Sequence, residues 1–241
     1  MEENTTFAEL PPMSETQQEI RNWFNDTYKK WGFMYLRPEP AYEIFASIIK
    51  PEKGHKHLDV ACGLGLLLNT MTRHGAMTYG VDLSDEAIKK AKEYCSEADI
   101  RIANAEQLPY ENESFDSISC IGSLERMLDR EKVLKEQFRV LKSDGKVCLM
   151  VRNSEHFVWK YLWKPLGIQN KKGHQDAMNL QEWTDLFEKS GYKVEALYPD
   201  HWPYYKIRRF LPPWKIDPAK ILKFPFSIQL AYEFIFVLRK S

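Results

Sequence analysis

The chain has 241 residues, of which 44% are hydrophobic and 28% charged, so it is long and apolar enough to bury a core as one domain. Its 34 basic and 34 acidic side chains cancel, which argues against a strongly basic nucleic-acid-binding domain. The four cysteines show no C-x-x-C spacing, so we expect thiols in a reducing compartment and no bound metal.

The N-terminal segment has no features of a signal peptide, because residues 1–12 are polar and acidic without an apolar core. We expect these residues to be a disordered tail. A helical cap over residues 13–50 should follow, with helices at 15–30 and 41–49. No apolar run is long enough to cross a bilayer, so the sequence predicts a cytoplasmic protein.

Strands and helices then alternate through the middle of the chain. We expect strands at residues 57–61, 78–82, 100–103, 115–121 and 146–152, and helices at 66–74, 85–96 and 131–141. Ser84 is placed to cap the second of these helices, and Ser143-Asp144-Gly145 is typical of a helix stop and turn. This alternation predicts an α/β fold with a doubly wound, mostly parallel sheet.

The pattern changes after residue 152. Residues 153–178 are irregular, a helix is expected at 181–190, and strands are expected at 192–197 and 232–239. A long segment rich in Pro, aromatic and basic residues separates the last two strands. We predict no internal repeat, and one domain overall.

A glycine turn follows the first predicted strand, in the pattern Asp59-x-Ala61-x-Gly63-x-Gly65. The next strand ends in Asp82. A strand, a glycine turn, a helix and a strand ending in an acid make the first half of a nucleotide-binding βαβ unit. Dinucleotide and S-adenosylmethionine (SAM) sites both use this arrangement.

Two residues discriminate between these cofactors. Leu68 occupies the position where a dinucleotide fingerprint needs a third small residue for close helix–strand packing. Asp59 would place a carboxylate beside a pyrophosphate, which is unfavourable, whereas it suits a cationic ligand that carries an amino acid. The pattern therefore resembles the first motif of the class I SAM-dependent methyltransferases.

The resemblance extends to later motifs. Asn104-Ala105-Glu106, followed by residues 113–116, is similar to the third and fourth motifs of small-molecule methyltransferases of the quinone-biosynthesis type. The segment from Gly122 to Glu125 is similar to the part that lines the transfer site, although Arg126 stands where the family often has His. Together the motifs cover residues 58–152.

The resemblance implies roles for individual residues. Asp82 would bind the ribose hydroxyls, Asn104 the adenine amino group, and the two turn glycines the methionine part. A Tyr or Arg of the cap can hold the cofactor carboxylate in this family, for which we name Tyr35 and Arg37. The complete predicted cofactor set is Asp59, Ala61, Gly63, Gly65, Asp82, Leu83, Asn104, Ala105, Glu106, Ile121, Tyr35 and Arg37.

The resemblance also implies a seven-stranded sheet that an antiparallel C-terminal hairpin closes. Residues 51–152 would form the SAM-binding core. Residues 153–241 would complete the sheet, with substrate-facing insertions at 153–178 and 199–228. The cofactor would be SAM and the product S-adenosyl-L-homocysteine.

Methyl transfer from a sulfonium is an in-line displacement, and alignment of the reacting atoms can contribute about 7–11 kcal/mol. A base is needed only if the acceptor atom carries a proton that must leave. Our first candidates are His174 with Asp176, in an insertion expected at the C-terminal edge of the sheet, together with Glu125. His156 and His201 are further candidates.

We therefore expect a SAM-dependent methyltransferase that acts on the O, N or C atom of a small molecule. A catalytically silent SAM-binding or scaffold protein and a nicotinamide-dependent oxidoreductase stay open as alternatives. Nucleic acid is disfavoured, because the fourth strand ends in Cys120-Ile-Gly-Ser instead of Asp/Asn-Pro-Pro-Tyr.

The expected partner is a small acceptor, with hydrophobic and lipid-linked molecules included. Residues 202–214 combine Trp, Tyr, Lys and Arg, which fits a lid, a peripheral membrane contact or a solvated loop. The chain is expected to be a monomer or a homodimer.

Overall fold

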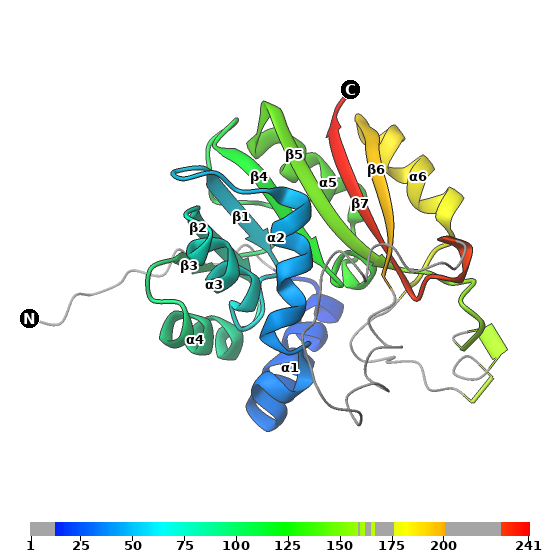
Figure 1. Cartoon of the computed structure of the whole chain (residues 1–241). Helices are drawn as coiled ribbons and strands as arrows, with labels where there is room; N and C mark the ends of the chain where they lie inside the picture. The colour runs from blue at the N-terminus through cyan, green and yellow to red at the C-terminus, as the bar shows by residue number, and fades with distance from the viewer. Residues whose placement is uncertain (1–12, 159, 162–164, 167–175, 201–227) are drawn as a thin grey trace, which may run out of the picture.

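The sheet has seven strands in the order β3-β2-β1-β4-β5-β7-β6 (Figure 1). The computed structural model describes residues 13–158, 160–161, 165–166, 176–200 and 228–241. Only β7 runs against its neighbours, and it pairs with both β5 and β6. The α/β class, the mostly parallel sheet and the antiparallel C-terminal hairpin are therefore confirmed. The strands are β1 (Lys56–Val60), β2 (Met77–Asp82), β3 (Asp99–Ile102), β4 (Phe115–Ile121), β5 (Leu141–Arg152), β6 (Tyr192–Asp200) and β7 (Glu233–Lys240).

Helices cover both faces of the sheet, because parallel strands need crossover connections. One face packs against α2 and α3, and the other against α5 and α6. The helices are α1 (Glu15–Trp31), α2 (Glu43–Ile49), α3 (Leu66–Arg73), α4 (Asp85–Tyr94), α5 (Arg130–Val140) and α6 (Leu180–Lys189). Short 3-10 turns are η1 (Gly32–Tyr35), η2 (Glu39–Tyr42), η3 (Leu124–Arg126) and η5 (Ile228–Leu230). No helix within the described ranges is long and apolar enough to cross a membrane.

The connection between α5 and β5 differs from the prediction. The sequence predicted a turn at residues 143–145, but β5 begins at Leu141, directly after the helix. Leu141 pairs with Phe115 and Lys146 with Ser117, so the residues between them form a bulge. A Cβ on Gly145 would lie 2.7 Å from Leu141 Cδ1 and 3.1 Å from the Asp116 carbonyl oxygen. Ser143, Asp144 and Gly145 therefore belong to a bulge within β5, which adds residues to the strand without ending it.

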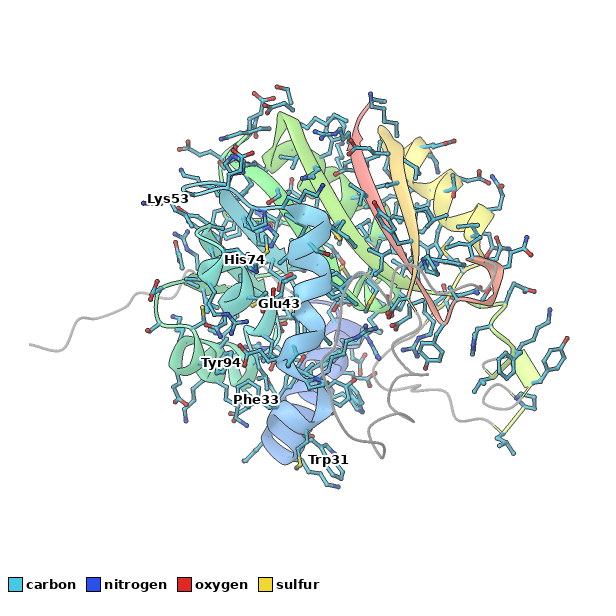
Figure 2. The ribbon with its side chains drawn as sticks, in the orientation of Figure 1. Trp31, Phe33, Glu43, Lys53, His74 and Tyr94 are labelled. Atoms are coloured by element: carbon cyan, nitrogen blue, oxygen red, sulfur yellow. The ribbon has the colours of Figure 1, made fainter. Side chains whose placement is uncertain are left out.

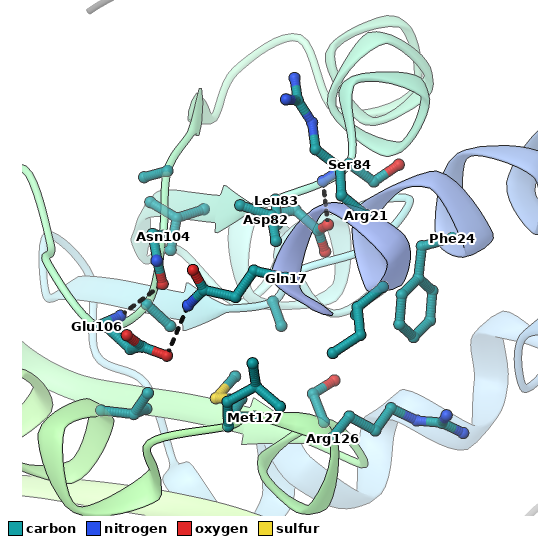
Figure 3. A pocket seen from close by; sticks show the side chains of 18 of the residues that line it. Gln17, Arg21, Phe24, Asp82, Leu83, Ser84, Asn104, Glu106, Arg126 and Met127 are labelled. Atoms are coloured by element: carbon teal, nitrogen blue, oxygen red, sulfur yellow. Dashed lines mark hydrogen bonds between the residues drawn. The ribbon is translucent and has the colours of Figure 1, made fainter. Parts of the chain in front are cut away.

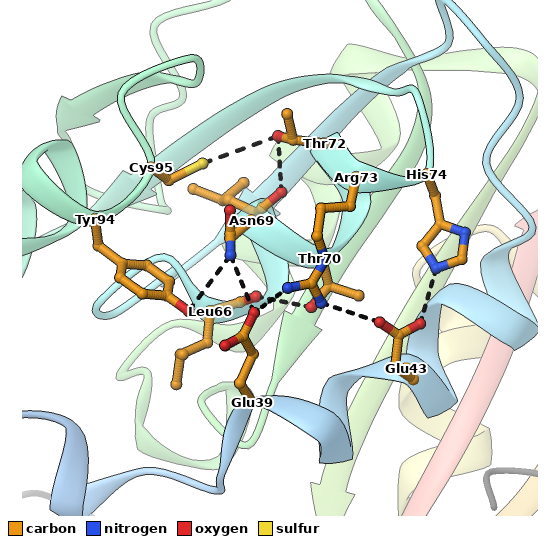
Figure 4. Close-up of polar contacts among 11 residues, drawn as sticks. Glu39, Glu43, Leu66, Asn69, Thr70, Thr72, Arg73, His74, Tyr94 and Cys95 are labelled. Atoms are coloured by element: carbon orange, nitrogen blue, oxygen red, sulfur yellow. Dashed lines mark hydrogen bonds and ion pairs between the residues drawn. The ribbon is translucent and has the colours of Figure 1, made fainter.

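The N-terminal cap is attached to α3 through a polar network (Figure 4). Arg73 pairs with Glu39 and with Glu43, and His74 Nε2 lies 2.8 Å from the Glu43 carboxylate. Asn69 Nδ2 donates to the Glu39 carboxylate at 3.1 Å. These contacts hold η2 and α2 against the helix that follows the glycine turn.

A buried ion cluster attaches the same cap to the C-terminal hairpin. The Arg37 guanidinium binds the carboxylates of Asp200 and Glu233, and Arg152 Nη2 lies 3.3 Å from the other Glu233 oxygen. Burial alone would raise the pKa of Glu233, but the charges of Arg37 and Arg152 outweigh it and hold that pKa below its usual range. Strand β6 continues to Asp200, which pairs with Glu233 of β7, three residues beyond the predicted end.

A second buried polar group lies inside the sheet, between β1 and β4. His57 contacts the hydroxyls of Ser117 and Ser119 at 2.9 and 3.0 Å, and Ser119 donates to Asp59 at 2.6 Å. Burial lowers the pKa of His57 to about 3, so the ring is neutral. Burial raises the pKa of Asp59 to about 7, although the Ser119 hydrogen bond opposes the shift.

Replacing Arg37 with Met should lower the free energy of unfolding by about 3–5 kcal/mol, because the buried carboxylates of Asp200 and Glu233 would lose the guanidinium that binds both of them. Urea denaturation followed by circular dichroism measures the change. Arg239→Met is the matched control, since Arg239 pairs with Glu195 at the surface, where such pairs contribute about 0–1 kcal/mol. If the two variants lost the same free energy of unfolding, the Arg37 cluster would not be a stabilising buried ion cluster.

Replacing Asp59 with Asn should change how stability depends on pH. The folded pKa is raised to about 7, so this group's contribution to stability is complete below its unfolded pKa of about 4 and is lost as pH rises through 7. The wild type should therefore lose stability between pH 4 and 7 while the Asn variant does not. The free energy of unfolding of the variant minus that of the wild type should rise over this range by up to about 1.4 kcal/mol per pH unit and stay constant above it. Urea denaturation at each pH measures both proteins. If their free energies of unfolding changed with pH in the same way, the pKa of Asp59 would not be raised.

Candidate cofactor and acceptor site

The turn after β1 has an unusual backbone. Ala61, Gly63 and Gly65 have φ values of +60°, +53° and +80°, in the left-handed region. A Cβ on Gly63 would lie 3.0 Å from the Tyr28 hydroxyl, so glycine leaves room for this side chain of α1. Ala61 adopts the left-handed conformation with a Cβ, and such strain is concentrated at functional sites.

Asp82 connects this turn to the end of β2. One carboxylate oxygen accepts the Gly63 N–H at 2.9 Å, and the other accepts the Ser84 N–H at 2.9 Å. Burial raises the pKa of Asp82, and these N–H donors oppose the shift. The carboxylate is thereby fixed at the carboxyl end of the sheet, where its remaining lone pairs can accept hydrogen bonds from a pair of hydroxyls.

The segment after β3 forms a tight polar turn. Asn104 Oδ1 accepts the Glu106 N–H at 2.9 Å, and the Glu106 carboxylate accepts a hydrogen bond from Gln17 Nε2 at 2.9 Å. A carbonyl oxygen has two lone pairs, so Asn104 retains capacity to bind a ligand as well as the turn.

These segments surround a cavity that α1 covers from the other side (Figure 3). Its volume is about 740 Å³ with its open mouth included. The lining residues come from α1, the ends of β1, β2 and β3, the η3 segment and α5. They are Gln17, Ile20, Arg21, Phe24, Tyr28, Ala61, Val81, Asp82, Leu83, Ser84, Ala103, Asn104, Ala105, Glu106, Ser123, Arg126, Met127, Leu128 and Val133.

Helix α1 is fastened to opposite walls of this cavity. Arg21 Nη2 lies 2.6 and 2.7 Å from the two Asp85 oxygens, and Ser84 Oγ donates to Asn25 at 2.6 Å. Across the cavity, Gln17 binds Glu106. Sequence reasoning predicted the helix but missed its role. The available signal was the spacing of Gln17, Arg21, Phe24 and Tyr28, which recurs on one helix face.

Some of the predicted cofactor residues line the cavity, and the others do not. Six line the cavity: Ala61, Asp82, Leu83, Asn104, Ala105 and Glu106. Among the others, Gly63 lies beside the cavity-lining Tyr28, and Gly65 faces Ala91 of α4. Asp59 is buried in β1, and Ile121 packs in the apolar cluster on the α2 side. The Tyr35 ring is half-exposed, 5.9 Å from the Tyr28 ring. Arg37 has other partners, since its guanidinium binds Asp200 and Glu233.

Glu125 is the catalytic candidate with the most unusual environment. It is fully buried in η3, between the cavity-lining residues Ser123 and Arg126. Neither carboxylate oxygen has a hydrogen-bond partner among the described residues. Burial raises the pKa of Glu125, although the charges of Arg152 and Arg126 oppose the shift.

The other candidates lie differently. Asp176 is mostly exposed, and its carboxylate pairs with Arg130 at 3.1 Å, while its N–H donates to the Glu125 carbonyl oxygen at 3.0 Å. His156 is buried, with its ring 5.1 Å from that of Tyr232. His174 and His201, like residues 202–214, lie outside the described residues. Within the described part of the chain, no cluster of three or more His, Cys, Asp or Glu side chains could hold a metal ion.

Comparison with known proteins agrees with this geometry. Residues 58–149 match the family model of a methyltransferase domain. The ubiquinone biosynthesis O-methyltransferase of Coxiella burnetii is 29% identical over 164 residues, which span 66% of this chain and 68% of that relative. These matches favour neither the oxidoreductase nor the silent scaffold.

Solved structures show the same fold. A possible histamine N-methyltransferase from Thermotoga maritima superposes with a TM-score of 0.67 at 19% identity, over 92% of this chain and 99% of that one. The geranyl diphosphate C-methyltransferase from Streptomyces coelicolor, solved with Mg²⁺, geranyl diphosphate and S-adenosyl-L-homocysteine, gives 0.70 at 14% identity, over 96% and 100%. Such identities show the fold alone.

The glycine turn, the buried acid at the end of β2 and the covered cavity therefore coincide with a matching family model and a related enzyme over two thirds of its length. Together these observations support a class I S-adenosylmethionine-dependent methyltransferase.

Proposed function

We propose that this enzyme methylates a hydroxyl group of a small molecule and that Glu125 accepts the hydroxyl proton. The observation that carries the proposal is the Glu125 carboxylate, which is fully buried in the segment between the cavity-lining Ser123 and Arg126 and has no hydrogen-bond partner among the described residues. Such a carboxylate destabilises the fold, and buried unsatisfied groups in native proteins call for a functional explanation. A protic acceptor would supply the missing donor.

The cavity residues fit SAM. Asp82 would hold the ribose hydroxyls, and Asn104 and Ala105 would hold the adenine ring. The methionine part would lie at the Gly63 turn, where we propose the Tyr28 hydroxyl as its polar contact in place of Tyr35 or Arg37. Support comes from the 3.0 Å approach that a Gly63 Cβ would make to that hydroxyl, and from the two carboxylates that already neutralise Arg37.

SAM, when bound, would supply a methyl group on a positively charged sulfur. The carbon–sulfur bond would break as the acceptor oxygen bonds to the methyl carbon, so that the sulfur would become a neutral thioether. Glu125 takes the proton that the acceptor oxygen loses, so the charges balance. The raised pKa of Glu125 strengthens it as a base once it is ionised. Arg152 and Arg126 favour that ionised form by their charge.

The nature of the acceptor is part of the proposal. The curated relatives are named as ubiquinone biosynthesis O-methyltransferases, which favours an oxygen nucleophile on a partly apolar molecule. We also propose that the enzyme works in the cytoplasm, because all four cysteines are buried free thiols.

Replacing Asp82 with Asn should weaken binding of S-adenosyl-L-homocysteine at least about tenfold, because the new amide would oppose a backbone N–H and disturb both turns. Isothermal titration calorimetry measures the affinity. Asp99→Asn is the matched control, since Asp99 pairs with Arg101 at the surface at the start of β3. Unchanged affinity in the Asp82 variant would remove this residue from the proposed site.

Replacing Glu125 with Gln should lower kcat by about 10²- to 10⁴-fold, the usual contribution of a positioned base. Affinity for S-adenosyl-L-homocysteine should not change. Labelled methyl transfer to a panel of phenols, amines and carbon acids measures the rate. The wild-type rate should rise with pH as Glu125 loses its proton, and the variant should lack this limb.

Stability provides a second readout that needs no acceptor. The folded pKa of Glu125 is raised, so its ionisation destabilises the fold as pH rises. Glu125→Gln should therefore increase the free energy of unfolding at pH 8 by about 1 kcal/mol or more, with a smaller gain at pH 5. Glu131→Gln, at an exposed pair with Lys189, is the control. A destabilised Glu125 variant, or methyl transfer to amines alone, would contradict the proposal.

A further inference from the structure

An apolar turn projects from the end of α1 (Figure 2). Its four large side chains are Trp31, Phe33, Met34 and Tyr35, with exposed fractions of 50%, 43%, 79% and 37%. Only Gly32 interrupts the run. Exposed apolar side chains that occur singly need no explanation, but a contiguous group on one turn indicates an interaction surface.

The turn is held in place at both ends. The Gly32 N–H donates to the Tyr28 carbonyl oxygen, and the Leu36 N–H donates to the Phe33 carbonyl oxygen at 3.2 Å. The Phe33 ring lies 4.9 Å from that of Tyr94 in α4, and Arg37 follows in the buried ion cluster. The exposed side chains are therefore presented by a fixed backbone.

Positive charge lies directly beside these side chains. Lys29 and Lys30 are exposed in the last turn of α1, and the Lys30 ammonium lies 5.1 Å from the centre of the Trp31 ring. The exposed acid of this helix end, Asp26, is one turn earlier. Tryptophan and phenylalanine beside lysine are typical of segments that rest in the headgroup region of a bilayer.

The position of the turn is also informative. It directly follows the helix that covers the cofactor cavity, and Arg37 ties it to the carboxyl-end edge of the sheet. A surface that meets this turn would therefore face the edge where β1, β2 and β4 end. An acceptor drawn from a lipid phase would reach the cavity from that side.

We propose that the turn of residues 31–35, together with Lys29 and Lys30, is a peripheral contact with anionic lipid bilayers. The aromatic and Met side chains enter the headgroup region, and the two lysines pair with lipid phosphates. The predicted membrane contact at residues 202–214 lies outside the described residues, so this surface is a different one. It does not depend on the identity of the acceptor or on Glu125.

Co-sedimentation of the full chain with vesicles tests the proposal. We expect binding to vesicles of phosphatidylcholine with 30% phosphatidylglycerol, weak binding to phosphatidylcholine alone, and loss of binding at high salt. The triple variant Trp31→Ser, Phe33→Ser, Met34→Ser should lose most of the binding. Lys29→Gln and Lys30→Gln should each weaken it about fivefold.

Met77→Ser is the matched control. Met77 is also 50% exposed, but it begins β2 at the opposite edge of the sheet, so its loss should not change sedimentation. Retained affinity for S-adenosyl-L-homocysteine will show that the triple variant is folded.

Three results would overturn the proposal. They are no sedimentation of the wild-type chain with anionic vesicles, unchanged sedimentation of the triple variant, and self-association that the triple variant abolishes without any vesicle binding. The last result would assign the turn to a protein interface. None of these measurements involves methyl transfer, so a failure here is distinct from a failure of the proposed reaction.

Discussion

The parallel pairing of β1 with both β2 and β4 is the constraint on which the rest of the structure depends. It brings three carboxyl ends to one edge, and the connections that follow β1 and β4 lead toward opposite sides of the sheet. The glycine turn and Asp82 occupy the resulting crevice, where Asp82 joins two turns through the N–H groups of Gly63 and Ser84. The groups at this edge, the glycine turn and Asp82 among them, therefore determine the chemistry of the site.

The cap depends on contacts between segments that are distant in the sequence. Arg21 with Asp85 and Gln17 with Glu106 place α1 across the cavity. The Arg37 cluster fixes the following turn to β6 and β7. One helix thereby lines the cavity along its length and presents the proposed lipid contact at its end. Changes to these ion pairs should affect both features together.

Buried carboxylates divide into satisfied and unsatisfied ones. Glu233 is neutralised by two arginines, and Asp59 receives the Ser119 hydroxyl and shares a network with His57. Glu125 has Arg152 and Arg126 near it but no hydrogen bond from the described residues. Because stability alone would favour a neutral group there, function is the simpler reason for an acid at this position.

The sequence by itself determined what local chemistry decides. Alternating periodicity predicted the strands, and a helix cap predicted where α4 begins. The glycine turn and the terminal acid predicted the crevice for which SAM binding is proposed. Tertiary structure alone decided the rest: Tyr28 lies at the cavity instead of Tyr35, Arg37 binds two carboxylates, and residues 142–145 form a bulge. The physical reason is the distance along the chain over which each interaction acts. Turn and capping preferences act within a few residues, whereas burial and ion pairing depend on partners more than a hundred residues away, such as Asp200 for Arg37.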